Sequence, residues 1–222
     1  MVNQYQVGVA HTEASVLATN KVLRNTYLLL SMTLLFSALT AWLSMSMNMP
    51  HPGVIITLAG YFGLLFLTNK FRNSAMGLVC VFALTGFMGM TLGPILNSYL
   101  KALPNGAELI MTAFGITGAV FMGLSAYALV SKKDFSFMGG FLTIGILGAF
   151  GLGLIAIFFN MPALSLAVSG MFVLAMGGLI LFQTSQIIHG GETNYIMATV
   201  TLYVTIFNLF TSLLHILGVM DE

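Results

Sequence analysis

Seven long apolar stretches alternate with short polar segments along this chain, and the seven Lys and Arg and six Asp and Glu side chains lie between the stretches or at their ends. A helix rises about 1.5 Å per residue, so about 20 residues cross the roughly 30 Å hydrocarbon core of a bilayer. The pattern therefore predicts an all-α integral membrane protein with seven transmembrane helices, the second near the lower limit of length: 25–47, 53–69, 75–99, 107–130, 137–159, 162–183 and 195–217.

The basic side chains give the predicted bundle an orientation. Short loops rich in Lys and Arg remain on the cytoplasmic side. Six of the seven Lys and Arg residues fall on one side, and only Lys101 falls on the other; the six are Lys21, Arg24, Lys70, Arg72, Lys132 and Lys133. We therefore expect a cytoplasmic N-terminus and an external, periplasmic C-terminus. The loop 186–194 has no Lys or Arg, so the orientation of the last two spans follows from counting alone.

Composition narrows the class of protein further. A hydrophobic fraction of 58% with 6% charged residues is too apolar for a soluble domain of 222 residues. The net charge of +1 offers no basic surface for nucleic acid. Cys80 is the single cysteine and lies inside an apolar span, so it can form neither an intramolecular disulfide nor a CxxC metal site. We expect no cofactor.

The chain divides into a polar tail at 1–24, a transmembrane domain at 25–218 and a short external tail at 219–222. Residues 1–20 are polar and mixed, without the basic start and short apolar core of a signal peptide. We predict a retained cytosolic tail without regular structure. Such a tail either serves as a handle for a cytosolic partner or simply frays.

Small residues in the spans indicate close helix packing. Gly89 and Gly93 form a small-xxx-small pair in the third span, and Ala149 and Gly153 form another in the fifth. Pro94 follows Gly93 and should kink or end the regular hydrogen bonding late in the third span. Such a helix break either lines a cavity or is a simple packing kink.

Polar side chains recur along the seventh span at steps of four, three, four and three residues, which places them on one face of a helix: Thr201, Thr205, Asn208, Ser212 and His215. Unsatisfied polar groups are costly in hydrocarbon, so we expect partners at the end of the sixth span, at Gln183, Thr184 and Ser185. The stripe is either a polar pathway or binding site in the bundle centre, or a set of hydrogen bonds that fixes packing.

Two segments near the C-terminus carry a family resemblance. The run FQTSQIIHGGETNY at 182–195, followed by LYVTIFNLF at 202–210, resembles the signature of the Bax inhibitor-1 (TMBIM) family. The runs KVLRNTY at 21–27, GPILN at 93–97 and KDFSF at 133–137 are similar to its bacterial YccA branch. The resemblance covers nearly the whole chain and implies a seven-helix bundle with the last helix central.

The resemblance also implies a function. A protein of the YccA branch would be a bacterial inner-membrane substrate and modulator of the ATP-dependent membrane protease FtsH, with the HflK/HflC complex as a further partner. We expect FtsH to engage the cytosolic tail while a tightly packed bundle resists extraction. The alternatives are a calcium, proton or small-solute channel between the sixth and seventh helices, and a membrane stress or scaffold protein without transport.

One departure from the wider family bears on the channel alternative. Members that resemble calcium-leak proteins carry one Asp in the sixth span and one in the seventh, a pair that can share a proton and gate with pH. Gln183 and Thr205 stand at these positions and do not ionise near neutral pH. A hydrogen bond between them is expected as a neutral substitute. His215 is the titratable side chain of the stripe, and we interpret it as an interfacial, hydrogen-bonded residue.

No arrangement of residues in the sequence indicates an enzyme. Calcium prefers several oxygen ligands, usually with carboxylates, and no Asp or Glu lies in the interior of a predicted span. Hydrolysis would need a carboxylate pair, an HExxH helix or a Ser with a His, and none appears. His189 and Glu192 flank Gly190-Gly191 but are too few to hold a metal, so a glycine-rich turn explains this segment.

Overall fold

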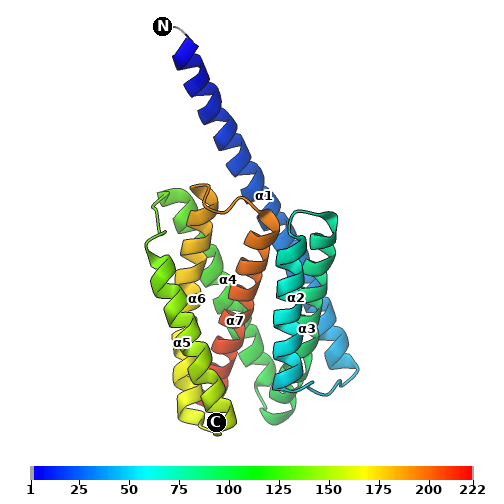
Figure 1. The fold of residues 1–222 in the computed structure, drawn as a ribbon. Helices are drawn as coiled ribbons and strands as arrows, with labels where there is room; N and C mark the ends of the chain where they lie inside the picture. The colour runs from blue at the N-terminus through cyan, green and yellow to red at the C-terminus, as the bar shows by residue number, and fades with distance from the viewer. Residues whose placement is uncertain (1–2, 222) are drawn as a thin grey trace.

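The computed structural model describes residues 3–221, and the regular structure in that range is α-helical (Figure 1). The helices are α1 (Asn3–Ser46), α2 (Val54–Phe71), α3 (Ala75–Ala102), α4 (Gly106–Ser131), α5 (Met138–Phe158), α6 (Pro162–Ile188) and α7 (Tyr195–Asp221). All seven are long and apolar enough to cross a membrane, with α1 contributing Thr19–Ser46. The seven-span prediction is confirmed, and the sixth helix ends later than expected.

The helices run back and forth between two ends of the bundle. The loops after α2, α4 and α6 lie at the end from which α1 projects, and those after α1, α3 and α5 lie at the other (Figure 1). We call the first the basic end, because it carries six of the seven Lys and Arg residues. The second is the C-terminal end, where α7 finishes and Lys101 lies (Figure 1).

The expectation that residues 1–24 lack regular structure is wrong. Helix α1 begins at Asn3 and continues without interruption into the membrane-length segment (Figure 1). The segment contains no proline, and extending an existing helix adds hydrogen bonds without the cost of a new nucleus. The composition of residues 1–24 indicated a polar tail, but it could not show that this tail continues the first transmembrane helix. Residues 1, 2 and 222 of the two predicted tails lie outside the described residues.

Helix α7 is central, as the family resemblance implies. It lies between the α5–α6 pair and the α2–α3 pair and packs against α1, α3, α4 and α6 (Figure 1). Tyr203 is its largest fully buried side chain, with 1% of its surface exposed. The Tyr203 hydroxyl lies 2.5 Å from Ser37 Oγ of α1 and donates to the carbonyl of Thr85 on α3 at 3.2 Å. This residue therefore joins three helices through one hydroxyl.

The glycines of α3 set its close approach to α1. A Cβ added to Gly89 would collide with Thr40 Oγ1 and the carbonyl of Ser37, and one added to Gly93 would lie 2.8 Å from the carbonyl of Ala41. The predicted small-xxx-small packing of the third span is thus confirmed, with α1 as the partner. In the fifth span, Ala149 and Gly153 lie on the side of α5 that packs against α6.

Pro94 lies inside α3 and does not end the helix, although it interrupts the regular hydrogen bonding. The helix continues to Ala102, although Pro94 has no N–H to donate to the carbonyl of Met90. Ser44 of α1 supplies the missing donor: its Oγ donates to Met90 O at 2.9 Å. The close approach at Gly93 brings Ser44 to this carbonyl, since a Cβ there would lie 2.6 Å from Ser44 Cβ. The hydrogen bond lost within α3 is therefore replaced between α1 and α3.

We expect Gly89→Ala to destabilise the bundle by about 1–3 kcal/mol, because the added methyl forces α1 away from α3. The matched control is Gly115→Ala on α4, where an added Cβ meets nothing within 4 Å. Alanine favours helix over glycine by about 1 kcal/mol, so the control should be neutral or stabilising. Thermal unfolding of the purified proteins in detergent measures both changes. Equal melting temperatures for the two variants would contradict the role assigned to Gly89.

Candidate functional site

The polar stripe of α7 lies where this helix packs against α6. Leu209, on the same side of α7, packs against Met176 and Ile180 of α6. Thr205 and Ser212 are buried, whereas Thr201, Asn208 and His215 are half-buried. The prediction that the stripe faces protein is consistent with these positions.

The stripe bonds mainly to its own helix. Thr205 Oγ1 donates to the carbonyl of Thr201 at 2.7 Å, and Asn208 Nδ2 donates to the carbonyl of Val204 at 2.8 Å. His215 Nδ1 lies 2.8 Å from Ser169 Oγ and so links α7 to α6 near the C-terminal end. Hydroxyls inside helices often bond the carbonyl four residues back in this way. The arrangement supports the packing interpretation of the stripe more than a continuous polar pathway.

The expected hydrogen bond between Gln183 and Thr205 is absent. Gln183 is buried at 5% exposure, and its Nε2 has no hydrogen-bond partner in the described part of the chain. Thr205 uses its hydroxyl proton on its own helix. The sequence placed the two residues on facing helices but could not show that the local acceptor would satisfy the threonine. A buried donor without a hydrogen-bond partner lowers the free energy of unfolding by about 1–3 kcal/mol. Gln183 Nε2 is therefore expected to destabilise the folded protein.

Further unpartnered polar atoms lie in the same half of the bundle, toward the basic end. They are Thr26 Oγ1 of α1 and Ser125 Oγ of α4, and both α1 and α4 pack against α6. The neighbouring Tyr27 hydroxyl is 3.5 Å from Thr184 Oγ1, so the polar partner of Thr184 lies on α1 and not on the α7 stripe, where it was expected. All these groups are neutral. None of them can exchange a proton near neutral pH.

The signature segment binds the loop between α4 and α5. Ser185 Oγ accepts a hydrogen bond from Phe135 N at 3.0 Å, and His189 Nε2 lies 3.2 Å from the carbonyl of Lys132. Gln186 Nε2 donates to Ser136 Oγ at 2.9 Å. From the sequence we expected Ser185 to be a hydrogen-bond partner of the α7 stripe, and its bond to the α4–α5 loop was missed. The run KDFSF at 133–137, which carried part of the resemblance, was the available signal that the two segments belong together.

A carboxylate tightens the same loop. Asp134 Oδ1 accepts the backbone N–H of Ser136 at 2.8 Å. Hydrogen bonds from the hydroxyl and N–H of Ser136 hold the pKa of Asp134 below its usual range. Asp134 is therefore charged at neutral pH and acts as a turn former rather than a proton carrier.

The rest of the signature forms the turn into α7. Gly190 adopts a φ of 76°, and Gly191 N donates to the carbonyl of Gln186 at 2.8 Å, which closes the end of α6. Asn194 Oδ1 then accepts from the N–H groups of Ile196 and Met197, capping α7. Its Nδ2 donates to the carbonyl of Arg72 in the α2–α3 loop at 3.0 Å.

Glu192 and His189 therefore both have roles in this turn. Glu192 Oε1 accepts the N–H of Asn194 at 2.7 Å, and His189 Nδ1 lies 2.9 Å from the carbonyl of Ser185. Among the side chains that the structure describes, within 17–221, no group of three His, Cys, Asp or Glu is placed to hold a metal ion. The segment joins three loops at the basic end through side-chain and backbone hydrogen bonds.

We expect Gln183→Met to stabilise the protein by about 1 kcal/mol, because it replaces a buried, unpartnered amide by an apolar group of similar length. Gln186→Met is the matched control, since it removes a hydrogen bond to Ser136 and should lower stability. Thermal unfolding in detergent compares the two. A loss of stability in Gln183→Met as large as in the control would mean that the amide binds a solute or ion in the folded protein.

The family model described as inhibitor of apoptosis-promoting Bax1 matches residues 19–222. An uncharacterized protein of Pseudomonas aeruginosa is 56% identical over 216 residues, 97% of this chain and 96% of its own. The modulator of FtsH protease YccA of Escherichia coli K12 is 54% identical over 213 residues, 96% of each chain. An uncharacterized membrane protein of Vibrio cholerae is 50% identical over 207 residues, 93% of this chain and 92% of its own. The seven membrane-length helices, the central α7 and these near full-length matches agree: the chain belongs to the Bax inhibitor-1 family and resembles its bacterial YccA branch.

Proposed function

We propose that this protein is a bacterial inner-membrane substrate and modulator of the FtsH protease, which engages it through the N-terminal part of α1. The observation that carries the proposal is the 54% identity, over 96% of both chains, to the protein named modulator of FtsH protease. A match of this extent leaves about nine of the 222 residues of this chain uncovered. The HflK/HflC complex is part of the proposal as a second partner.

The charge distribution supports a cytoplasmic N-terminus. Six of the seven Lys and Arg residues lie at the basic end, from which α1 projects (Figure 1). Cations flanking short loops remain in the cytoplasm, so this end would face the ATP-driven part of a membrane protease. A relative of 54% identity in Escherichia coli O6:H1 is named an inner membrane protein, which supports the same membrane for this chain.

The projecting part of α1 supplies the proposed handle. Helix α1 begins at Asn3, whereas its membrane-length segment begins at Thr19. The segment between them stands beyond the loops of the basic end (Figure 1). At about 1.5 Å per residue it reaches roughly 24 Å from the bundle. A pulling protease would grip this segment and transmit force directly into the first transmembrane helix.

The contacts of α1 explain how such a substrate would also modulate the protease. Ser37, Ser44 and the carbonyl of Met45 are hydrogen-bonded to α7 or α3, and Gly89 and Gly93 allow close packing along the same interface. All of these contacts break when α1 leaves the bundle. Slow extraction would keep the protease occupied, and other substrates would be degraded more slowly.

A second candidate is a leak for ions or small solutes between α6 and α7. The unpartnered amide of Gln183 favours it, because a passing solute would supply the missing hydrogen bond. The hydroxyl of Thr205 does not favour a leak, because it already donates to the carbonyl of Thr201 on its own helix. Cation flux into liposomes that is altered by Gln183→Leu or Thr205→Val would support the leak, and absence of flux from pH 5 to 8 would remove it.

The modulator proposal is tested by a chase of protein turnover in cells with and without active FtsH. We expect the full chain to be degraded in an FtsH-dependent way, and a chain lacking residues 2–18 to persist severalfold longer, because the handle is gone. Thermal unfolding of the purified short form should match that of the full chain, which shows that the bundle is intact.

A replacement variant separates length from sequence. Residues 3–18 replaced by a Gly/Ser segment of equal length keep a handle but remove its helix. Restored turnover would show that reach is sufficient, and persistence would show that the helix or its side chains are recognised. Turnover of the deletion variant at the rate of the full chain, or turnover independent of FtsH, would overturn the proposal.

A further inference from the structure

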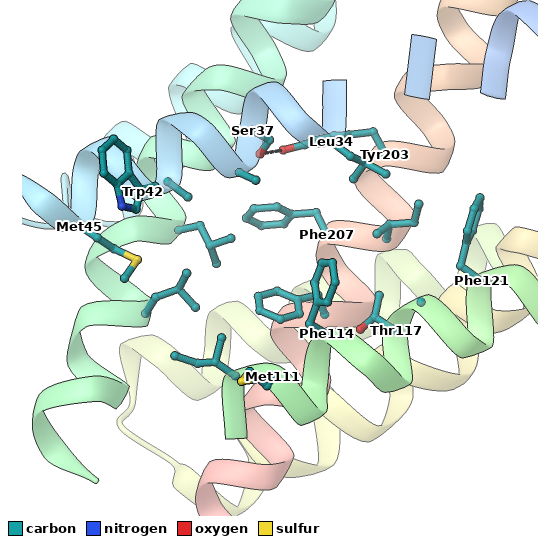
Figure 2. Close-up of a pocket in the computed structure, with 18 residues that line it drawn as sticks. Leu34, Ser37, Trp42, Met45, Met111, Phe114, Thr117, Phe121, Tyr203 and Phe207 are labelled. Carbon is teal, nitrogen blue, oxygen red and sulfur yellow. Dashed lines mark hydrogen bonds between the residues drawn. The ribbon is translucent and has the colours of Figure 1, made fainter. Parts of the chain in front are cut away.

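A large apolar groove opens on the side of the bundle between α1 and α4 (Figure 2). Both helices pack against α3 and α7, and they are not among the helix pairs in extensive contact with each other. The groove has a volume of about 520 Å³ and is lined by positions 34–45 of α1 and 110–121 of α4, with Leu92 and Leu96 of α3 and positions 203–210 of α7 behind them. We call it the α1–α4 groove.

The groove is suited to hydrocarbon rather than to water or ions. The hydroxyls that line it already have partners: those of Ser37 and Tyr203 bond to each other, and Thr117 Oγ1 donates to the carbonyl of Ala113 at 2.7 Å. The remaining lining is aliphatic, aromatic or methionine, with Phe114 and Phe207 projecting into the space between the helices (Figure 2). Water in such a space loses hydrogen bonds, so an apolar occupant is favoured.

The length and position of the groove match one leaflet of a bilayer. Eleven helical rises separate Leu34 from Met45 and Ile110 from Phe121, which is roughly 16 Å at about 1.5 Å per residue. Half of a roughly 30 Å hydrocarbon core is about 15 Å. The groove therefore runs from the middle of the membrane toward the C-terminal end. An acyl chain of that leaflet would lie along it for its whole length.

The outer mouth of the groove carries the one Lys or Arg of the C-terminal end. Met45 and Leu96 line the groove, and just beyond them Lys101 Nζ donates to Asn48 Oδ1 at 2.8 Å. An ammonium group has three donors, so Lys101 can bind a phosphate oxygen while it keeps this bond. Glu108, in the first turn of α4, adds a carboxylate to the same end. Glu108 therefore disfavours a headgroup that carries negative charge beyond the phosphate. The group that Lys101 would recognise is the phosphate that all glycerophospholipids share.

A tryptophan marks the depth of this mouth. Trp42 is the single tryptophan of the chain, lines the groove and is 60% exposed. Tryptophan favours the boundary between hydrocarbon and headgroups. Its position one turn before the end of α1 agrees with a headgroup at Lys101.

From the lining, the length and the charge at the mouth, we propose that the α1–α4 groove binds one acyl chain of a glycerophospholipid while Lys101 binds its phosphate. The lipid comes from the leaflet at the C-terminal end, and it closes the lateral opening that α1 and α4 leave between them. Exposed Met111 and Phe114 on α4 would then contact lipid along the side of the groove.

Trp42 provides the measurement, because it is the only tryptophan and lies in the groove. We would titrate the purified full chain in detergent with a phosphatidylcholine brominated in one acyl chain and follow quenching of its fluorescence. Saturable quenching is expected at a low ratio of lipid to detergent. Gly118→Leu fills the groove from a position where an added Cβ meets nothing within 4 Å, and should raise the midpoint about tenfold.

The matched control is Gly115→Leu, on the same helix, equally open and outside the groove lining, and it should leave the midpoint unchanged. Ala38→Leu fills the groove from α1 and replaces Gly118→Leu if that variant does not fold. Lys101→Gln should raise the midpoint by up to about fivefold, as expected for one exposed charge.

Two results would overturn the proposal. Equal midpoints for the full chain, Gly118→Leu and Gly115→Leu would mean that the quenching comes from surrounding lipid. Absence of quenching at every lipid concentration would mean that another occupant, such as a second copy of the chain, covers Trp42.

Discussion

The hydroxyl of Tyr203 is the point at which three helices depend on one another, since it bonds Ser37 of α1 and the carbonyl of Thr85 on α3 from the centre of α7. In hydrocarbon, no water replaces a broken hydrogen bond, so polar groups must find partners within the protein. The same constraint acts at Pro94, where α3 loses a donor and Ser44 of α1 provides one. Both bonds need α1 close to α3, and the glycines of α3 make that approach sterically feasible.

The spans could be predicted because membrane crossing depends on length and apolar composition, which are properties of each segment by itself. The helical start of α1 could not, because the conformation of residues 3–18 depends on the helix to which they are attached. The failed pairing of Gln183 with Thr205 has a similar origin: an acceptor four residues back on the same helix satisfied the hydroxyl first. The bond from Ser44 to Met90 depends on how α1 and α3 are aligned along each other, and the sequence pattern of each helix does not contain this information.

The residues that carried the family resemblance largely have structural roles in this chain. Ser185, Gln186 and His189 fix the α4–α5 loop to the end of α6, and Asn194 caps α7 while binding the α2–α3 loop. Three connections between neighbouring spans are thus held together at the basic end. The neutral groups at Gln183 and Thr205 lie in the bundle just below this tied end. Neither residue makes a hydrogen bond to these loops, so their chemistry can change without loosening the loops.

The interface between α1 and α3 has a mechanical consequence. The hydrogen bonds that hold α1 here are spaced along its axis, from Ser37, which bonds Tyr203 of α7, through Ser44 to the carbonyl of Met45, which accepts from Asn97 of α3. A force applied at the N-terminus acts along that same axis and loads these contacts in shear. In shear, they bear the load together, whereas peeling a helix sideways breaks contacts one at a time. The direction in which α1 projects from the bundle is therefore the direction in which its attachment is strongest.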